Sequence, residues 1–102
     1  MNEEAGKSNN RANSLMDQGR IDEALALYEQ AIVLDPTDPV PWNGKGNALK
    51  DLDRFEEALD AYNRAIELDP EDSYPWNGRG NVLVTLERPA DGLDAYARAI
   101  GI

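Results

Sequence analysis

Three pairs of asparagines, each spaced four residues apart, are the side chains best suited to binding chemistry. The pairs are Asn9 with Asn13, Asn43 with Asn47, and Asn77 with Asn81. Residues four apart lie on one face of a helix, so each pair places two carboxamides side by side. A carboxamide has N–H donors and a carbonyl acceptor. A row of them can therefore bind the backbone of an extended peptide without selecting its side chains.

Catalytic chemistry finds little support in the sequence. The chain has no Cys and no His, which excludes thiol nucleophiles, histidine bases and the usual zinc sites. Its serines therefore have no base to activate them, and paired acid–base work needs two carboxylates that converge in a dry cleft. Acidic pairs flank two prolines but lack the spacing of a calcium loop, and the Asp-Pro turn explains them without metal. We predict a protein that is not an enzyme and has no catalytic residue, metal or cofactor.

Composition excludes further classes of function. The 102 residues include 20 acids and 10 bases, and the net charge of -10 argues against binding to nucleic acid. The longest aliphatic run, residues 31–34, is far shorter than the ~20 residues of a membrane helix. The N-terminus lacks the basic start and apolar stretch of a secretion signal. We expect one domain over residues 1–102, cytoplasmic and without membrane or nucleic-acid partners.

The helices that must position these side chains can be predicted from an internal repeat of 34 residues. Residues 39–68 and 73–102 share 16 identities in 30 positions, and residues 5–38 and 39–72 share 15 in 34. Apolar residues recur at helical spacing within each unit, and no segment alternates as a strand does. An Asp-Pro pair ends the second helix of the first two units. The pattern predicts six helices, at roughly 6–18, 21–34, 40–52, 55–68, 74–86 and 89–101.

These units resemble the tetratricopeptide repeat (TPR) family. The middle unit matches the family pattern at Trp42, Gly46, Ala58, Tyr62, Ala65 and Pro70, and the third at Trp76, Gly80, Tyr96 and Ala99. The first matches at Ala24, Tyr28, Ala31 and Pro36, but has Ser8 for the tryptophan and Ala12 for the glycine. The resemblance implies an all-α, right-handed α-solenoid of three helix-turn-helix repeats. These would span residues 5–38, 39–72 and 73–102, with the first helix of each pair lining a concave groove.

The family's groove positions include all six asparagines, together with Lys50 and Tyr74. The resemblance therefore implies a scaffold that binds a peptide segment of a partner protein through an asparagine ladder, with Lys50 and Tyr74 adding side-chain preference. Alternatively, the asparagines interlock neighbouring repeats or are inherited from duplication. A known family clamp for a chaperone's C-terminal carboxylate maps to Asn9, Asn13, Gly44, Tyr74 and Gly78. Only Asn13 agrees and the clamp's cations are missing, so we do not expect that ligand.

Two features depart from the family pattern. Arg11, Lys45 and Arg79 replace the usual leucine and form a basic column. This column either meets an acidic ligand or, as we expect, packs its stems on neighbours and pairs its charges with nearby acids. Gly44 and Gly78 add a second glycine to their helices, each at a cost of about 1 kcal/mol relative to alanine.

The two ends of the repeat array differ. The first helix is polar on nearly all sides, as an outer cap is. The third repeat is four residues short and no capping helix follows it, so Leu93, Tyr96 and Ile100 are expected to lack the cover that a following helix would give. We expect either a longer protein or a homo-oligomer. A self-assembling structural module that associates through these three residues is therefore the alternative function.

Overall fold

The computed structural model describes residues 3–102, which form six helices and no strand. The helices are α1 (Glu3–Asp17), α2 (Ile21–Leu34), α3 (Pro39–Asp51), α4 (Phe55–Leu68), α5 (Ser73–Thr85) and α6 (Pro89–Gly101). The all-α fold and its six helices are confirmed, and the largest difference in a helix end is at the start of α1. Residues 1–2 of the predicted domain lie outside the described residues. Within residues 3–102, no helix is long and apolar enough to span a bilayer.

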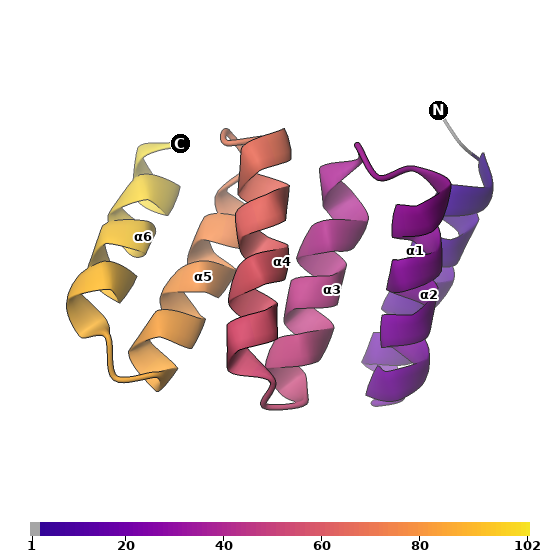
Figure 1. Cartoon of the computed structure of the whole chain (residues 1–102), viewed down its shortest axis with the longest axis horizontal. Helices are drawn as coiled ribbons and strands as arrows, with labels where there is room; N and C mark the ends of the chain where they lie inside the picture. The colour runs from indigo at the N-terminus through magenta and orange to yellow at the C-terminus, as the bar shows by residue number, and fades with distance from the viewer. Residues whose placement is uncertain (1–2) are drawn as a thin grey trace.

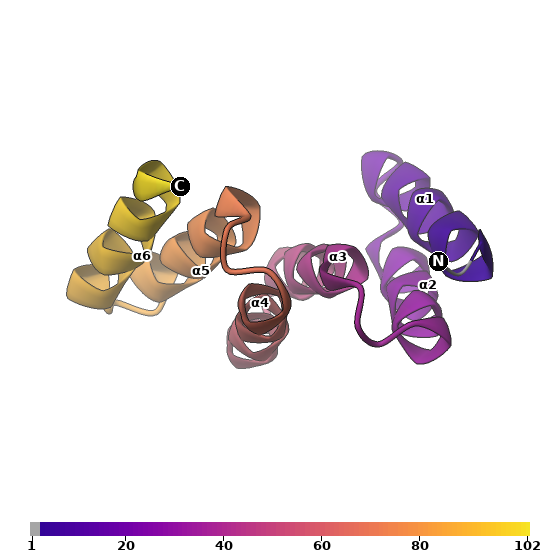
Figure 2. The same cartoon turned by 90° about the horizontal axis from the view of Figure 1, so that it is seen from above.

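The helices stand side by side in chain order, with the two termini at opposite ends of an array of 38 × 26 × 18 Å (Figures 1 and 2). Each helix packs on the next one in the chain. In addition, α3 contacts both α1 and α5, whereas within residues 3–102 α4 contacts neither α2 nor α6. The first helices of the three hairpins are thus closer together than the second helices and form the inner row of the curve.

The Asp-Pro turns use both of their acids structurally. Asp38 and Asp72 are N-caps whose side chains accept from the backbone N–H of Val40 and Tyr74, each at 3.0 Å. Asp35 accepts from the hydroxyl and backbone N–H of Thr37, at 2.7 and 3.1 Å. These bonds to the charged form lower the pKa of Asp35. Capping and turn closure account for these acids, as the sequence predicts.

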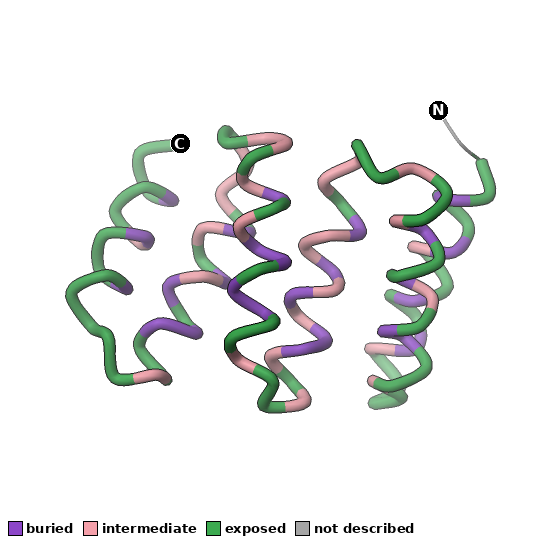
Figure 3. The backbone as a smooth tube through the Cα atoms, in the orientation of Figure 1, coloured by how far each residue is buried: buried purple, intermediate pink, exposed green. Residues whose placement is uncertain are grey.

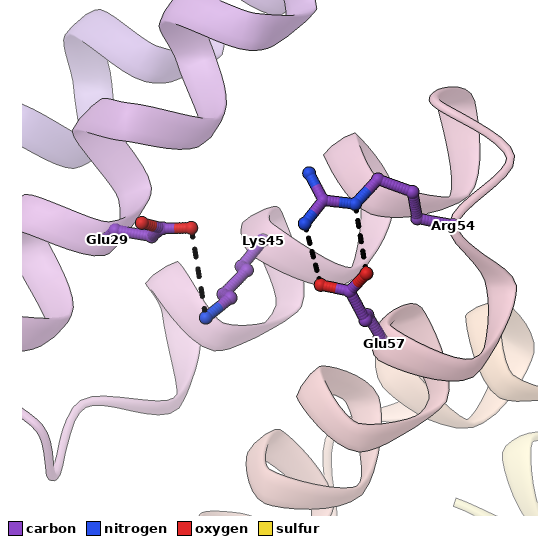
Figure 4. Close-up of polar contacts among 4 residues, drawn as sticks. All are labelled: Glu29, Lys45, Arg54 and Glu57. Carbon is purple, nitrogen blue, oxygen red and sulfur yellow. Dashed lines mark hydrogen bonds and ion pairs between the residues drawn. The ribbon is translucent and has the colours of Figure 1, made fainter.

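The shorter turns, which join the two helices of a hairpin, share a second structural feature in all three hairpins. Gly19, Asp53 and Glu87 have φ of +76°, +59° and +60°, the left-handed conformation that ends many helices. One residue later an arginine pairs with an acid in the first turn of the following helix. Figure 4 shows this pair for Arg54, whose Nε and Nη2 lie 3.0 and 2.7 Å from the carboxylate oxygens of Glu57. The pairing lowers the pKa of Glu57 and raises that of Arg54.

The extra glycines make room for tyrosine rings at the joints between hairpins. A Cβ atom on Gly78 would lie 2.5 Å from Cε1 of Tyr62, and one on Gly44 would lie 2.6 Å from Cζ of Tyr28. Gly46, within the same hairpin as Tyr62, also borders that ring, at 2.6 Å from its Cε1. Tyr62 is fully buried. The cost of a second helical glycine is thus offset by close packing of the preceding hairpin's aromatic ring.

Candidate functional site

One asparagine of each pair is bound by the tyrosine of its own hairpin. The hydroxyls of Tyr62 and Tyr96 donate to Oδ1 of Asn47 and Asn81, each at 2.5 Å. The same bond joins Tyr28 to Asn13. A tyrosine on the second helix therefore holds an asparagine on the first helix in all three hairpins. This is an interlock, although it runs within a hairpin and between side chains, whereas the sequence interpretation placed it between repeats.

The tyrosine bond fixes how each amide is presented. Because Oδ1 accepts from the hydroxyl, the amide NH₂ group is the part that remains to donate to a ligand. Burial, and to a lesser extent the charge of Asp51, raises the pKa of the Tyr62 hydroxyl. Burial also raises the pKa of Tyr28, with a smaller effect from Asp17. Both hydroxyls therefore stay protonated at neutral pH and keep donating to their asparagines.

The other asparagine of each pair has a different environment. Oδ1 of Asn9 and of Asn43 is shielded from solvent and has no hydrogen-bond partner. Both side chains are only half-buried, whereas Asn77 is exposed. A shielded acceptor without a donor costs about 1–3 kcal/mol. These two oxygens are therefore acceptors that gain from a donor able to reach them.

The residues around the asparagines are a mixture of apolar and polar side chains. Tyr74 is 73% exposed, Val40 and Val84 are also exposed, and Lys50 is half-buried. We use the name asparagine face for the surface formed by these four residues and the six asparagines. It lies on the inner row of helices. Within the described part of the chain, no three acidic side chains gather as the ligands of a metal ion would.

The basic column lies away from the asparagine face, at the joints between hairpins. Nζ of Lys45 on α3 is 4.0 Å from a carboxylate oxygen of Glu29 on α2, as Figure 4 shows, and 5.5 Å from the ring centroid of Trp42. Arg79 on α5 donates to Oδ1 of Asn63 on α4. The predicted packing and pairing is confirmed for Lys45. Arg79 has an amide partner where an acid was expected.

A family comparison matches nearly the whole chain. The tetratricopeptide repeat model matches residues 9–73 and again residues 43–102. The chain belongs to the tetratricopeptide repeat family. A comparison with curated proteins finds no match.

Solved structures of TPR domains share this fold. The second TPR domain of Spaghetti (RPAP3), bound to the HSP90 peptide SRMEEVD, superposes with a TM-score of 0.93 at 20% identity, covering 96% of this chain and 91% of that one. The Sgt2 TPR domain from Aspergillus fumigatus gives 0.94 at 23% identity, with coverage of 98% and 66%. The Yersinia enterocolitica translocator chaperone SycD, in an alternative dimer, gives 0.92 at 15%, with coverage of 97% and 75%.

The residues predicted to mediate self-association lie at the C-terminal end of the TPR array. Leu93 and Ile100 are 66% and 86% exposed, and the ring of Tyr96 is half-buried beside Gly80. Figure 3 shows that the buried positions of α6 lie on its side facing α5. Tyr28 and Tyr62 each pack on a glycine of the next hairpin, whereas within residues 3–102 Tyr96 has no such second contact.

The sequence analysis missed the tyrosines as positioning residues. Tyr28, Tyr62 and Tyr96 were interpreted as matches to the family pattern, and Tyr96 also as a self-association residue, but none was linked to an asparagine. The available signal was that Tyr and Asn recur together in every repeat, 15 residues apart. Gly44 and Gly78 carried a similar signal, since each follows a tyrosine by 16 residues.

Proposed function

We propose that this TPR domain binds a peptide segment of a partner protein on its asparagine face. The supporting observation is the tyrosine bond to Asn13, Asn47 and Asn81, which leaves three amide NH₂ groups oriented by the fold. Orientation fixed before binding lowers the entropy cost of the complex. Such donors suit the backbone carbonyls of an extended segment.

The neighbouring side chains supply apolar contact. Tyr74, Val40 and Val84 are exposed beside the amides, and burying them adds affinity. The Spaghetti domain of the same fold was solved with a bound peptide, which supports a peptide as ligand class. Its HSP90 peptide ends in acids. The chain has Asn9, Tyr74 and Gly78 where a chaperone clamp has cations, so we propose a different segment.

The test must distinguish binding of a peptide by the asparagine amides from the hydrogen bond that the same amides accept from the tyrosine hydroxyls. Peptides selected from a random library against the wild-type chain serve as probes. Asn81→Ala removes the donors, whereas Tyr96→Phe removes only the hydroxyl that holds the amide. We expect Asn81→Ala to weaken binding about three- to tenfold and Tyr96→Phe to weaken it less. Equal effects of the two variants would assign Asn81 to structure alone.

A second candidate function is self-assembly through Leu93, Tyr96 and Ile100. The high exposure of Leu93 and Ile100 favours it. Stacking α1 of a second copy onto α6 in the geometry of the other joints would place Asn10 where α3 and α5 have glycine. The ring of Tyr96 would then meet the Cβ atom of Asn10. We therefore propose a symmetric contact between two α6 helices.

Sedimentation of charged variants tests this assembly. Ile100→Glu is expected to reduce a concentration-dependent mass to that of a monomer. Val33→Glu, at an 81% exposed position of α2, is the matched control and should leave the mass unchanged. A wild-type chain that stays monomeric at high concentration would refute the assembly.

A further inference from the structure

A cavity of about 360 Å³ lies between α4, α5 and α6. It is on the side of α5 that faces away from Asn77 and Asn81. Trp76 and Arg79 line it from α5, and Arg98 lines it from α6. At 100° per residue, Trp76 and Arg79 lie roughly 150° around α5 from Asn77 and Asn81. A ligand in this cavity would therefore not compete with one on the asparagine face.

The cations of this cavity lack the acidic partners that their counterparts have in the middle repeat. There, Lys45 faces Glu29 at 4.0 Å, and Arg64 faces Glu67 at 2.9 Å. A cavity beside Trp42, which Lys45, Glu57 and Asp60 help to line, measures about 170 Å³. The cations of the middle repeat are thus neutralised by the protein itself.

In the third repeat both acidic partners are replaced. Asn63 stands where Glu29 does, and binds Arg79 as a neutral acceptor. Gly101 stands where Glu67 does, and Arg98 lies with Cζ 5.8 Å from the ring centroid of Trp76. No carboxylate of the described residues lies within ion-pair distance of either arginine. Two guanidinium groups without an ion-pair partner, both lining one cavity, are unusual in a chain whose net charge is -10.

We propose that this cavity binds the carboxylate of a glutamate side chain from a partner protein. The guanidinium groups of Arg79 and Arg98 would donate charge-assisted hydrogen bonds to it, and Trp76 would pack against its methylene groups. We define the Trp76 pocket as the cavity lined by these three residues and Asp94. A protein source suits the setting, because the asparagine face, on which we propose that a peptide binds, lies on the opposite side of α5.

The remaining acids of the Trp76 pocket define the charge of the ligand. Glu67 lines it but is paired with Arg64, and Asp94 supplies one negative charge. Two arginines and Asp94 leave a single net positive charge, which matches one carboxylate. One carboxylate would leave the pocket neutral, whereas a dianion such as phosphate would leave it with a net negative charge beside Asp94. The pocket therefore favours a monocarboxylate.

The two tryptophans of the chain provide a matched pair of reporters. The indole N–H groups of Trp42 and Trp76 each donate to a proline carbonyl at 3.1 Å, so they begin in equivalent environments. The probes are acetyl-Ala-Glu-Ala-amide, its Gln isostere, free glutamate and inorganic phosphate, at matched ionic strength. Each is titrated into the full chain while the two indole signals are followed by NMR.

The expected result is a saturable shift of the Trp76 signal with the Glu peptide, about tenfold tighter than with the Gln peptide. The Trp42 signal should stay unchanged. Free glutamate or phosphate that binds more tightly than the Glu peptide would overturn the choice of a protein side chain. Equal shifts of both indoles, or equal binding of the Glu and Gln peptides, would overturn the pocket.

Variants of the protein test the pocket with the same Glu peptide as probe. Arg98→Gln should abolish the Trp76 response, whereas Arg64→Gln, at the same position of the middle repeat, should leave it intact. Gly101→Glu should recreate the arrangement of Arg64 with Glu67, so that Arg98 pairs with the chain's own carboxylate and no longer binds the peptide. All three positions are exposed, so circular dichroism should show an unchanged fold. Binding that survives both Arg98→Gln and Gly101→Glu would refute the proposal.

Discussion

The ring of Tyr62 occupies the space that a Cβ atom on Gly78 would need, with Cε1 2.5 Å from that point. Its other side borders Gly46, and its hydroxyl donates to Asn47 at 2.5 Å. One side chain thus packs two helices together and orients an amide on the asparagine face. Stability and the proposed binding surface depend on the same residue.

Gly78→Ala should destabilise the chain, although alanine is the better helix former by about 1 kcal/mol. The added methyl group must displace the ring of Tyr62, and overpacking of this kind costs about 1–3 kcal/mol. Urea unfolding followed by circular dichroism measures the change. Gly6→Ala is the control, because a Cβ atom there meets nothing within 4 Å and should stabilise α1. Equal responses at the two positions would contradict the packing argument.

Tyr62→Phe should remove an alkaline sensitivity of the fold. The pKa of Tyr62 is raised in the folded chain, so above about pH 10 the unfolded chain releases a proton that the folded chain retains. The free energy of unfolding then falls as pH rises. At neutral pH the variant should lose about 1 kcal/mol with its hydrogen bond to Asn47.

Urea unfolding at neutral pH and near pH 11 measures both effects of Tyr62→Phe. Tyr74→Phe, at a 73% exposed position, is the control and should keep the wild-type pH dependence. A Tyr62→Phe variant that loses as much stability at high pH as the wild type would show that other groups cause the alkaline loss.

Glu87→Gly should stabilise the third hairpin by about 0.5–1 kcal/mol. Glu87 has φ of +60°, a conformation that costs a residue with a Cβ atom more than it costs glycine. Asp53→Gly should gain less, because aspartate tolerates the left-handed region better. Gly19→Ala, at the equivalent turn, should lose stability. Thermal unfolding of the three variants measures the order of their stabilities. A Gly19→Ala variant more stable than the wild type would contradict the prediction.

Lys45→Leu, which restores the family's usual residue, should change the free energy of unfolding by less than about 1 kcal/mol. The pair with Glu29 is long, and the Glu29 side chain is 52% exposed, which makes such pairs weak. Leucine would replace the contact of the Lys45 ammonium group with the Trp42 ring by apolar packing. A double-mutant cycle with Glu29→Gln isolates the ion pair. A coupling well above 1 kcal/mol would show that the basic column is a major source of stability.

The helices could be predicted from the sequence because their signals are local. The 34-residue period, the Asp-Pro pairs and the helical spacing of apolar residues each operate within a few turns. The pairing of the basic column with a nearby acid was also predicted correctly for Lys45, because a charged side chain beside a neighbouring helix has few other options. The fold class therefore follows from the sequence pattern.

The interactions between helices could not be predicted in the same way. Asn47 and Tyr62 are 15 residues apart on different helices, and their contact depends on the angle between those helices. Gly44 was read only as a cost in helix propensity, because its benefit comes from a ring on another hairpin. Glu29 and Asn63 are partners of the basic column from the preceding hairpin, a contact that the spacing of residues along one helix does not reveal.

Asn10 occupies the helix position at which α3 and α5 have Gly44 and Gly78. A tyrosine placed against α1 as Tyr28 is placed against α3 would therefore meet the Cβ atom of Asn10. The hairpin of α3 and α4 has both a glycine to receive a ring and a tyrosine to offer one. Tandem duplication of that middle hairpin would reproduce both the glycine and the tyrosine of each joint, so an array of this type can lengthen by copying a single unit.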